Sequence, residues 1–480
     1  MDAKTTPTLA KPPADALERF RRIVGPKGWT TDAADMAPHV TDWRGNYTGQ
    51  AAMVLRPRTT DEVRRIVKTA NEFSIALVPQ GGNTSLCGAS VPSGSGNEIV
   101  VSLTRMRTIR NVDPLNYTIT VDAGLCIQEI QEEAAKVDRL FPMSFGAEGS
   151  AEIGGAISTN AGGVNVLKYG NMRALVLGLE AILPNGDLFD DLTGLRKDNT
   201  GYDLKQLLIG AEGTLGIITA ATLMLYPTIK ASATALAAVP SPKAAVELLA
   251  LAREASSDHV TSFELMSRYA LDMAFKHVPG CVDPLAKPYE WYVLIELGSP
   301  RSHDLLRRRL EDVLTTALDK NLVLDGALAA NVAQAQTLWR LRHGIPEGEK
   351  KEGKAIKHDI SVPVSQLPTY MKATRETLLD IAPDLQLSIF GHIGDGNLHY
   401  NVQKWPEISP EEFDELRPDI TDTIYNGLAA FGGSISAEHG IGQLKRDALR
   451  QVKAPATLGA MQTIKTALDP KGIMNPGKVL

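Results

Sequence analysis

The chain has few of the residues and patterns that mark several large protein classes. Only three of its 480 residues are cysteines, Cys87, Cys126 and Cys281, and no two form a CxxC pair, which argues against a disulfide framework and a thiolate metal site. No apolar run is long enough for a signal peptide or a bilayer span, so we expect a soluble, cytoplasmic protein without a membrane span. The 50 basic and 56 acidic residues give a net charge of -6, which disfavours nucleic acid and favours a small-molecule ligand.

The glycine pattern of a standard dinucleotide-binding domain is also missing. No GxGxxG follows an early strand, but a strand at 51–57, a helix beginning at an N-capping Thr60 and a strand at 75–79 are predicted. The last strand runs directly into Gly81–Ser85. Backbone N–H groups that no Cβ shields suit a pyrophosphate, although many such loops are only turns.

Two further glycine-rich stretches follow. Residues 142–163 read PMSFGAEGSAEIGGAISTNAGG, with hardly any charge, and residues 210–219 place glycines just before a β-branched strand. Close packing of backbone against an extended ligand explains such composition, and packing of backbone against backbone is the alternative. Three glycine clusters without GxGxxG predict a dinucleotide fold of another kind.

After residue 227 the composition changes. Ala- and Leu-rich helical segments at 241–256, 303–319 and 366–381 alternate with strand-like runs at 291–297 and 385–390. This mixture predicts an antiparallel sheet with helices on one side, as in a separate cap domain.

The stretch 390–401, FGHIGDGNLHYN, is predicted to be a β-hairpin. Asp395-Gly396 is a two-residue turn signal between alternating runs. The turn lies midway between His392 and His399, so the two imidazoles should face each other across the strands, with Asn401 on the same face. Such a pair could begin a metal site. The alternative is a solvent-facing hairpin with two unrelated histidines.

Charged residues in two other stretches add to this picture. Glu438 in SAEHGIGQLKR completes a two-His, one-carboxylate set of the kind that binds Zn, Fe or Mn. Residues 347–354 resemble a solvated loop, with Arg342 at the end of the helical run before it. Lys357 lies outside this charge run, in a strand-like segment.

The ordered motifs PQGGNTS, PMSFGAEGSAEIGGAISTNAGG, AEGTLGIIT, GHIGDGNLH and SAEHGIGQLKR cover nearly the whole chain. In this order they resemble the vanillyl-alcohol oxidase and p-cresol methylhydroxylase superfamily, in the branch of D-lactate, glycolate and D-2-hydroxyglutarate dehydrogenases. The resemblance implies an α+β fold in three parts. Residues 1–228 form an FAD-binding domain, 229–434 a substrate-binding cap, and 435–480 a segment that completes the active site and packs on the FAD domain.

The resemblance also implies the residues that hold FAD. Some relatives attach the flavin through a histidine in the first glycine loop, but this chain has Asn83 there, so we expect non-covalent FAD. The implied FAD positions are Gln80, Gly81, Gly82, Asn83, Thr84, Pro142, Met143, Gly149, Ser150, Gly154, Gly155, Thr159, Asn160, Gly163 and Ile218.

By the same resemblance, His392, His399 and Glu438 are the metal ligands and His439 is the general base. Arg342, Lys357 and Asn401 contact the substrate, and two cations suit a dicarboxylate. The implied reaction is metal-assisted oxidation of D-2-hydroxyglutarate to 2-oxoglutarate by hydride transfer to FAD, with zinc the expected metal and Mn or Fe the alternatives.

Other functions stay open. Pro346 stands where animal members carry a substrate-contacting Thr, which opens the site to a shorter diacid such as D-malate. A D-lactate or glycolate dehydrogenase is one alternative, and a non-flavin metal-dependent hydrolase or metal-binding protein is another. We also expect a homodimer that passes electrons to an electron-transfer flavoprotein or a quinone.

Overall fold

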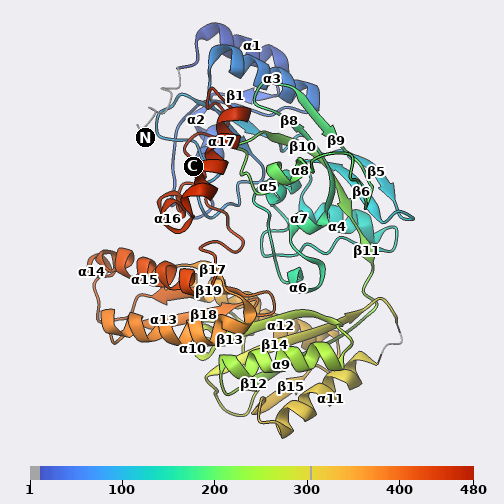
Figure 1. Cartoon of the computed structure of the whole chain (residues 1–480), viewed down its shortest axis with the longest axis vertical. Coiled ribbons are helices and arrows are strands. Elements are labelled where there is room, and N and C mark those ends of the chain that lie inside the picture. The colour runs from blue at the N-terminus through green and yellow to red at the C-terminus, as the bar shows by residue number, and fades with distance from the viewer. Residues whose placement is uncertain (1–10, 303–304) are drawn as a thin grey trace. The chain divides into compact units, whose positions relative to one another are not determined.

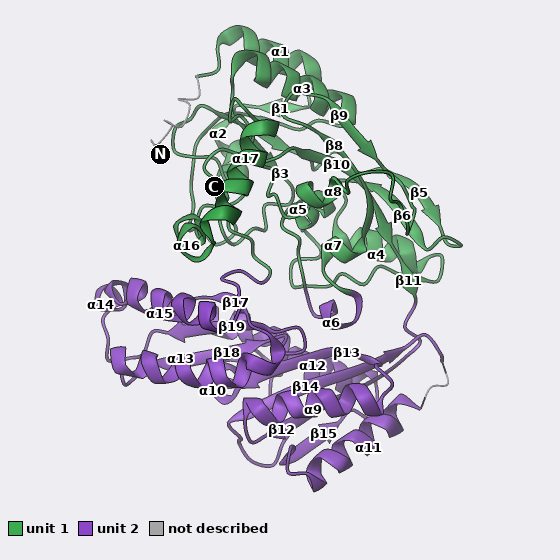
Figure 2. Ribbon diagram, viewed as in Figure 1, with its two compact units in different colours: residues 1–162, 170–227, 438–480 green, residues 163–169, 228–437 purple. Residues whose placement is uncertain are grey.

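The computed structural model describes residues 11–302 and 305–480, which form two compact units (Figures 1 and 2). Unit 1 contains residues 11–162, Gly170–Pro227 and Glu438–Leu480, and unit 2 contains Gly163–Tyr169 and Thr228–Ala437. Both units combine helices and sheets, and the sheet of unit 2 is antiparallel throughout, so the predicted α+β class is confirmed.

Unit 1 contains a four-stranded sheet of order β1-β2-β4-β3, in which β4 pairs in parallel with β2 and β3. Its strands are β1 (Trp29–Thr30), β2 (Ala51–Leu55), β3 (Leu77–Gln80) and β4 (Glu98–Ser102). The strands predicted from 51 and 75 are confirmed. The helix between them, α3 (Thr60–Phe73), is capped by Thr59 and not by Thr60, because the Thr59 hydroxyl accepts the Glu62 N–H.

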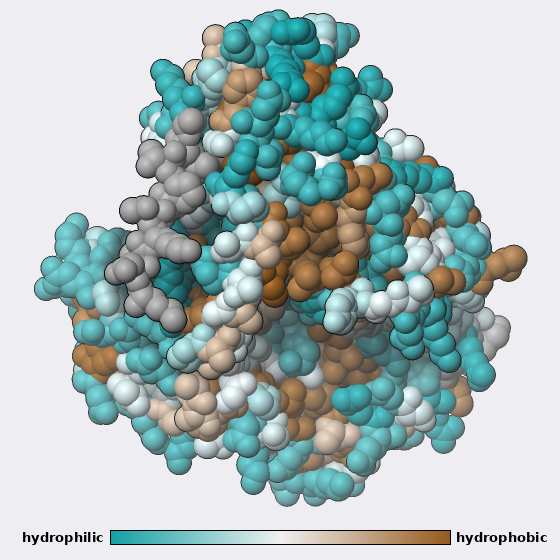
Figure 3. All heavy atoms as spheres, turned by 45° about the horizontal axis from the view of Figure 1, so that its top comes forward, coloured by the Kyte–Doolittle hydropathy of each residue, from teal (hydrophilic) through white to brown (hydrophobic). Residues whose placement is uncertain are grey.

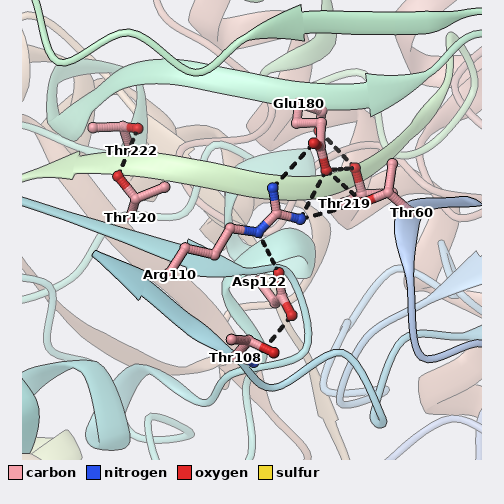
Figure 4. A network of polar contacts seen from close by, with 8 residues as sticks. All are labelled: Thr60, Thr108, Arg110, Thr120, Asp122, Glu180, Thr219 and Thr222. Atoms are coloured by element: carbon pink, nitrogen blue, oxygen red, sulfur yellow. Dashed lines mark hydrogen bonds and ion pairs between the residues drawn. The ribbon is translucent and has the colours of Figure 1, made fainter. Parts of the chain in front are cut away.

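A second, five-stranded antiparallel sheet has the order β5-β6-β10-β8-β9. These strands are β5 (Ile109–Asp113), β6 (Thr118–Asp122), β8 (Val176–Ile182), β9 (Leu188–Asp191) and β10 (Ile217–Met224). Arg110 ties them together: it donates to Asp122 at 2.7 Å and to both oxygens of Glu180 at 2.9 and 3.0 Å (Figure 4). Thr60 and Thr219 donate to the same Glu180 oxygen, so the ionic network also reaches α3.

The remaining elements of unit 1 are short. They are α1 (Ala14–Val24), α2 (Ala33–Val40), α4 (Ile127–Ala135), α5 (Ile153–Ser158), α7 (Met172–Leu175), α8 (Lys205–Leu208), α16 (Arg446–Val452) and α17 (Pro455–Leu468), with β7 (Arg139–Leu140) paired to β11 (Tyr226–Pro227).

The C-terminal segment returns to unit 1. Glu212, which is buried, accepts the N–H groups of Ile441 and Gly442 at 2.7 and 2.8 Å. Asn475 donates its side-chain amide to the carbonyls of Ala89 and Glu212. These buried bonds fix residues that lie more than two hundred positions apart in the chain, so the C-terminal segment is part of the folded core of unit 1.

Unit 2 is built on an eight-stranded sheet of order β15-β12-β14-β13-β18-β19-β16, with β17 also paired to β19. The strands are β12 (Ala231–Val239), β13 (Val260–Ser267), β14 (Trp291–Ser299), β15 (Asp325–Leu328), β16 (Ala355–Ile356), β17 (Asp359–Ser361), β18 (Gln386–Gly391) and β19 (Asn397–Gln403). Unit 2 also holds α6 (Val166–Tyr169), next to which Ser262 donates to the Val164 carbonyl.

The other helices of unit 2 include one at each of the three segments predicted at 241–256, 303–319 and 366–381. They are α9 (Pro242–Ala255), α10 (Arg268–His277), α11 (Leu306–Asp319), α12 (Val332–Glu352), η1 (Val364–Gln366), α13 (Leu367–Ile381), α14 (Pro410–Glu415) and α15 (Arg417–Ala430). The predicted start of α11, residues 303–304, lies outside the described residues.

Helix α12 corrects one prediction. Residues 347–352 continue the helix instead of forming a solvated loop, and Arg342 lies in its middle instead of at its end. The glycines of α12 explain how the helix packs: a Cβ at Gly348 would come 2.7 Å from the Met273 backbone of α10. Close approach of the two helices buries one face of α12, including Glu349, a charged position that the sequence pattern assigned to solvent.

The surface view in Figure 3 mixes hydrophilic and hydrophobic side chains over the face that it shows. Among the described residues, we find no helix whose length and apolar character would suit a membrane crossing.

Candidate active site

The hairpin predicted at 390–401 is confirmed, but its register is not. Phe390 pairs with His399 and Ile389 with Tyr400, so five residues, 392–396, connect β18 to β19. The two histidines therefore do not face each other across the strands. Gly391 and Gly396, on either side of this connection, have φ of +152° and +90°, conformations that glycine adopts more readily than other residues.

The loop nevertheless brings the histidines together. Their ring centroids lie 6.3 Å apart, and each ring offers a nitrogen within 4.8 Å of one on the other. Asp359 of β17 pairs with His399 across the sheet and also has an oxygen within that distance of a His399 nitrogen. Within unit 2, His399 thus lies close to a second imidazole and, separately, to a carboxylate, which are ligand types that suit Zn, Mn or Fe.

His392 is held by a residue that the sequence did not point to. Its Nδ1 lies 2.5 Å from Oε1 of Glu264 on β13, and Oε2 of the same carboxylate accepts the Arg342 Nε at 2.7 Å. Glu264 is fully buried, and Arg342 and His392 are also buried. One carboxylate therefore joins a predicted metal ligand to a predicted substrate contact.

The Phe390 ring lies next to both Arg342 and His399. The Arg342 guanidinium lies 4.9 Å from the centre of the Phe390 ring, and that ring lies 4.8 Å from the His399 imidazole. A cation over an aromatic face is attracted by the ring's quadrupole. Strand β18 thus supplies one ring that contacts both the arginine and the second histidine.

Lys357 and Asn401 meet at a second buried carboxylate. Glu349 of α12 accepts the Lys357 ammonium at 2.7 Å through Oε2 and the Asn401 amide at 2.9 Å through Oε1. The Asn401 carbonyl oxygen also accepts the His358 N–H, which fixes the orientation of its amide. Glu349 is 1% exposed, whereas the Lys357 side chain is 29% exposed and can reach a ligand.

Sequence reasoning missed Glu349, but a signal was present. Arg342, Ile345 and Glu349 follow one another at spacings of three and four residues, so they share one helical face, and all three are buried. The sequence pattern indicated a solvated loop because six of the eight residues at 347–354 are Lys or Glu and the other two are Gly.

Glu438 and His439 are the first two residues of the last segment of unit 1. They directly follow Ala437 of unit 2, whose N–H donates to the Asp359 carbonyl at 3.4 Å.

The glycine clusters meet inside unit 1. A Cβ at Gly82 would lie 1.8 Å from the Ser150 carbonyl oxygen, and one at Gly81 would lie 3.3 Å from the Glu152 Cβ and 3.5 Å from the Gly155 nitrogen. The loop after β3 therefore lies directly on the start of α5. In this glycine cradle, Gly81–Gly82 against Ser150–Gly155, backbone packs against backbone, and the glycine N–H groups, which no Cβ shields, are of the kind that a pyrophosphate binds.

Glu152 places a buried carboxylate oxygen in the cradle that lacks a hydrogen-bond partner within the described part of the chain. Its Oε2 has no hydrogen-bond partner among the described residues, and its side chain is 3% exposed. Burial raises the pKa of Glu152 to about 8, against the opposing charge of Arg107 and with that of Glu129. A buried carboxyl that keeps its proton can donate to a bound ligand, so the cradle fits the polar part of FAD.

The other implied FAD positions come from several elements of the chain. Asn83 has φ +54° and donates to the carbonyls of Pro38 and Thr41, while Gln80 donates to those of His39 and Ser90. Thr84 continues the first loop, Pro142, Met143 and Gly149 precede α5, Gly154 lies in it, Thr159 and Asn160 end it, and Ile218 lies on β10. Gly163 begins the short segment that belongs to unit 2.

Comparison with known proteins covers both units. A family model of the FAD binding domain matches residues 51–191, and one of the C-terminal domain of FAD linked oxidases matches residues 228–479. A probable mitochondrial D-2-hydroxyglutarate dehydrogenase of Oryza sativa subsp. indica is 38% identical over 97% of this chain and 82% of the relative. A D-2-hydroxyglutarate–pyruvate transhydrogenase of Saccharomyces cerevisiae is 35% identical over 99% of this chain and 96% of the relative.

Solved structures agree on the fold. p-Cresol methylhydroxylase with substrate bound superposes with a TM-score of 0.72 over 97% of this chain and 96% of that chain, at 15% identity. At so low an identity the likeness carries the fold alone, and it confirms the fold expected from the five motifs.

The same relatives correct the predicted location. The rice relative is named as mitochondrial, as are others from Arabidopsis thaliana, fission yeast and cattle, so the prediction of a cytoplasmic protein is contradicted. That prediction rested on the lack of a secretory signal and of a membrane span. Neither absence distinguishes one interior compartment from another.

Proposed function

Since the chain belongs to the FAD-linked oxidases and is an FAD-dependent 2-hydroxy acid dehydrogenase, we propose that it oxidises D-2-hydroxyglutarate to 2-oxoglutarate. The alternative of a non-flavin hydrolase or metal-binding protein is wrong, because the two family models together match most of the chain. The choice of substrate is supported by one observation above all. Arg342 and Lys357 lie in the same unit as the histidine pair, and each is anchored on its own buried glutamate.

Two anchored cations suit a substrate with two carboxylates. An arginine can grip a carboxylate with two parallel N–H donors, whereas a lysine acts as a point charge. We assign Arg342 and Lys357 to the substrate carboxylates, with Asn401 as a further contact. Glu264 and Glu349 restrict how far these cations can move, so a bound 2-hydroxy acid would present a single face of its C2 carbon.

The metal site is assigned to His392, His399 and Glu438. A divalent ion there, zinc by expectation, would lower the pKa of the substrate hydroxyl. We assign His439 as the base that removes the hydroxyl proton, since imidazole accepts protons near neutral pH. Asp359 pairs with His399 across the sheet, and one of its carboxylate oxygens lies within 4.8 Å of a His399 nitrogen, so Asp359 is placed to help orient that ring.

FAD is assigned to the glycine cradle, bound without a covalent link, and supplies the hydride acceptor of the reaction. The Gly81 and Gly82 backbone would hold its pyrophosphate. The buried Glu152 carboxyl would donate a hydrogen bond to a polar atom of FAD, which would give the unpartnered Glu152 oxygen a partner.

Anaerobic mixing of the FAD-loaded protein with 2-hydroxy acids tests this function. We expect D-2-hydroxyglutarate to bleach the flavin absorption rapidly, D-malate to bleach it as well, and L-2-hydroxyglutarate to leave it unchanged. Pretreatment with EDTA should abolish the bleaching, and added zinc should restore it. Bleaching by D-lactate or glycolate with little response to the diacids would instead support the lactate or glycolate alternative, with Lys357 unused.

We also propose an oligomeric state and an electron acceptor. We expect a homodimer, which light scattering of the purified protein can test. We expect an electron-transfer flavoprotein or a quinone to reoxidise the reduced flavin. Because the yeast relative is named as a transhydrogenase with pyruvate, pyruvate should be tested as an electron acceptor beside these two. Reoxidation by pyruvate alone would contradict the first two acceptors.

A further inference from the structure

Glu264 is placed by the sheet itself. Strand β13 pairs with β18 through Leu265 opposite Gly391 and Met266 opposite Phe390, and continuing that antiparallel register brings Glu264 next to His392. The same carboxylate faces α12, where Arg342 donates to it at 2.7 Å. Three elements distant in sequence therefore meet at one residue that is 0% exposed.

The contact with His392 determines which ring nitrogen is left for a metal. A carboxylate that is ion-paired with an arginine can only accept hydrogen bonds. The His392 Nδ1, 2.5 Å away, therefore carries a proton, and in the neutral ring Nε2 is the nitrogen that can coordinate a metal. A carboxylate that fixes the tautomer of a ligating histidine in this way raises its basicity and orients its ring.

The contact with Arg342 likewise determines which donors are left for a substrate. Its Nε is used by Glu264, and among the described residues Nη1 and Nη2 have no hydrogen-bond acceptor. The guanidinium plane is held over the Phe390 ring, so these two donors are fixed in direction.

From these contacts we infer that Glu264 is a positioning residue that sets the His392 tautomer for the metal and aims Arg342 at the substrate. This inference rests on the proposed function, which makes His392 a metal ligand and Arg342 a substrate contact. It predicts that one substitution weakens both metal binding and substrate binding, although Glu264 touches neither.

The substitution Glu264→Gln separates the two contacts without changing the volume of the side chain. An amide has one acceptor oxygen and one donor nitrogen, so it can satisfy Arg342 or the present His392 tautomer but not both. With its oxygen on Arg342, its NH2 group would select the tautomer that protonates Nε2 and removes the metal-binding lone pair. The matched control is Glu349→Gln, an equally buried glutamate that contacts Lys357 and Asn401 but not His392.

Calorimetric titration of zinc into EDTA-stripped, FAD-loaded protein measures the metal side. We expect Glu264→Gln to raise the zinc Kd about 10- to 100-fold, the usual loss when such a partner is removed, and Glu349→Gln to leave it within about threefold. At saturating zinc, Glu264→Gln should still raise the KM for D-2-hydroxyglutarate, because a neutral amide holds the Arg342 guanidinium less firmly than a carboxylate does. Glu264→Asp, which keeps the charge but is one methylene shorter, should restore part of the zinc affinity.

The possible outcomes separate this inference from the proposed function. An unchanged zinc Kd in Glu264→Gln, with a wild type that binds zinc and bleaches with substrate, overturns the inference and leaves the proposed function standing. A wild type that binds no zinc yet oxidises the diacid overturns the metal assignment and this inference together. Thermal unfolding and the flavin spectrum of each variant exclude a folding defect, and if Glu264→Gln does not fold, the Kd of Glu264→Asp decides.

Discussion

The two units hold their candidate sites in different ways. In unit 1 the glycine cradle is made of backbone, where Gly82 leaves no room for a Cβ beside Ser150. In unit 2 the site is made of charged side chains, each held by a buried glutamate, Glu264 or Glu349. A backbone site fails when volume is added. A side-chain site fails when a hydrogen-bond partner is removed.

The largest effect should come from adding volume to the cradle. Gly82→Val places a Cβ 1.8 Å from the Ser150 carbonyl oxygen, so one of the two segments must move. We expect the purified variant to be colourless and to take up no FAD when titrated. Gly94→Ala is the control, since a Cβ there meets nothing within 4 Å, and it should bind FAD normally. Normal FAD content in Gly82→Val would show that this loop is not the cofactor's site.

His439→Ala should produce the next largest effect. We expect normal FAD binding and flavin reduction by D-2-hydroxyglutarate slower by at least about 100-fold, the usual loss when a general base is removed. Stopped-flow absorption under anaerobic conditions measures it. A higher pH should partly offset the loss, because hydroxide can then take the proton. Near-normal reduction would remove His439 from the proposed chemistry.

Removing a cation from unit 2 should affect one class of substrate more than another. Lys357→Ala should raise the KM for D-2-hydroxyglutarate about 10- to 100-fold, the worth of a charge-assisted hydrogen bond, and change the KM for D-lactate little. Lys350→Ala, an exposed lysine of the same region, is the control with normal KM values. An equal rise for both acids would mean that Lys357 supports the fold of the site and does not read the second carboxylate.

The difference between the units also explains what the sequence could predict. The strand at 75–79, the glycine loop after it and the α+β class were predictable, because glycine spacing and alternation are local signals. The hairpin was predictable but its register was not, since the Asp395-Gly396 signal predicts a two-residue turn whereas five residues, 392–396, join the two strands.

Glu264 could not be predicted from local signals at all. It lies 128 positions from His392 and 78 from Arg342, and it comes from a buried strand that reads VTSFELMS. Only the pairing of β13 with β18 makes its carboxylate a partner of the histidine. Glu349 was hidden for a different reason, because the charged residues around it in the sequence suggested a surface loop.

The smallest and most specific effect concerns Glu152, the buried carboxyl of the cradle that lacks a hydrogen-bond partner among the described residues. Burial raises the pKa of Glu152 to about 8 from a value near 4.5 in the unfolded chain, so the folded protein keeps a proton that the unfolded chain has lost. This group's contribution to stability is present below pH 4.5 and is lost as the pH rises through about 8. The loss amounts to about 1.4 kcal/mol per pH unit within that window.

The side chain of the Glu152→Gln variant cannot ionise. The Tm difference between the FAD-free variant and the FAD-free wild type should therefore grow in favour of the variant from pH 5 to pH 8 and stay constant above pH 8. Glu132→Gln, at an exposed position of α4, should follow the wild type throughout. A constant difference between Glu152→Gln and the wild type would mean that Glu152 ionises normally, and therefore that water reaches the cradle when FAD is absent. A growing difference that disappears once FAD is added would mean that the bound cofactor takes the proton of Glu152 in a hydrogen bond. The backbone cradle would then depend on one side chain, as the site of unit 2 does.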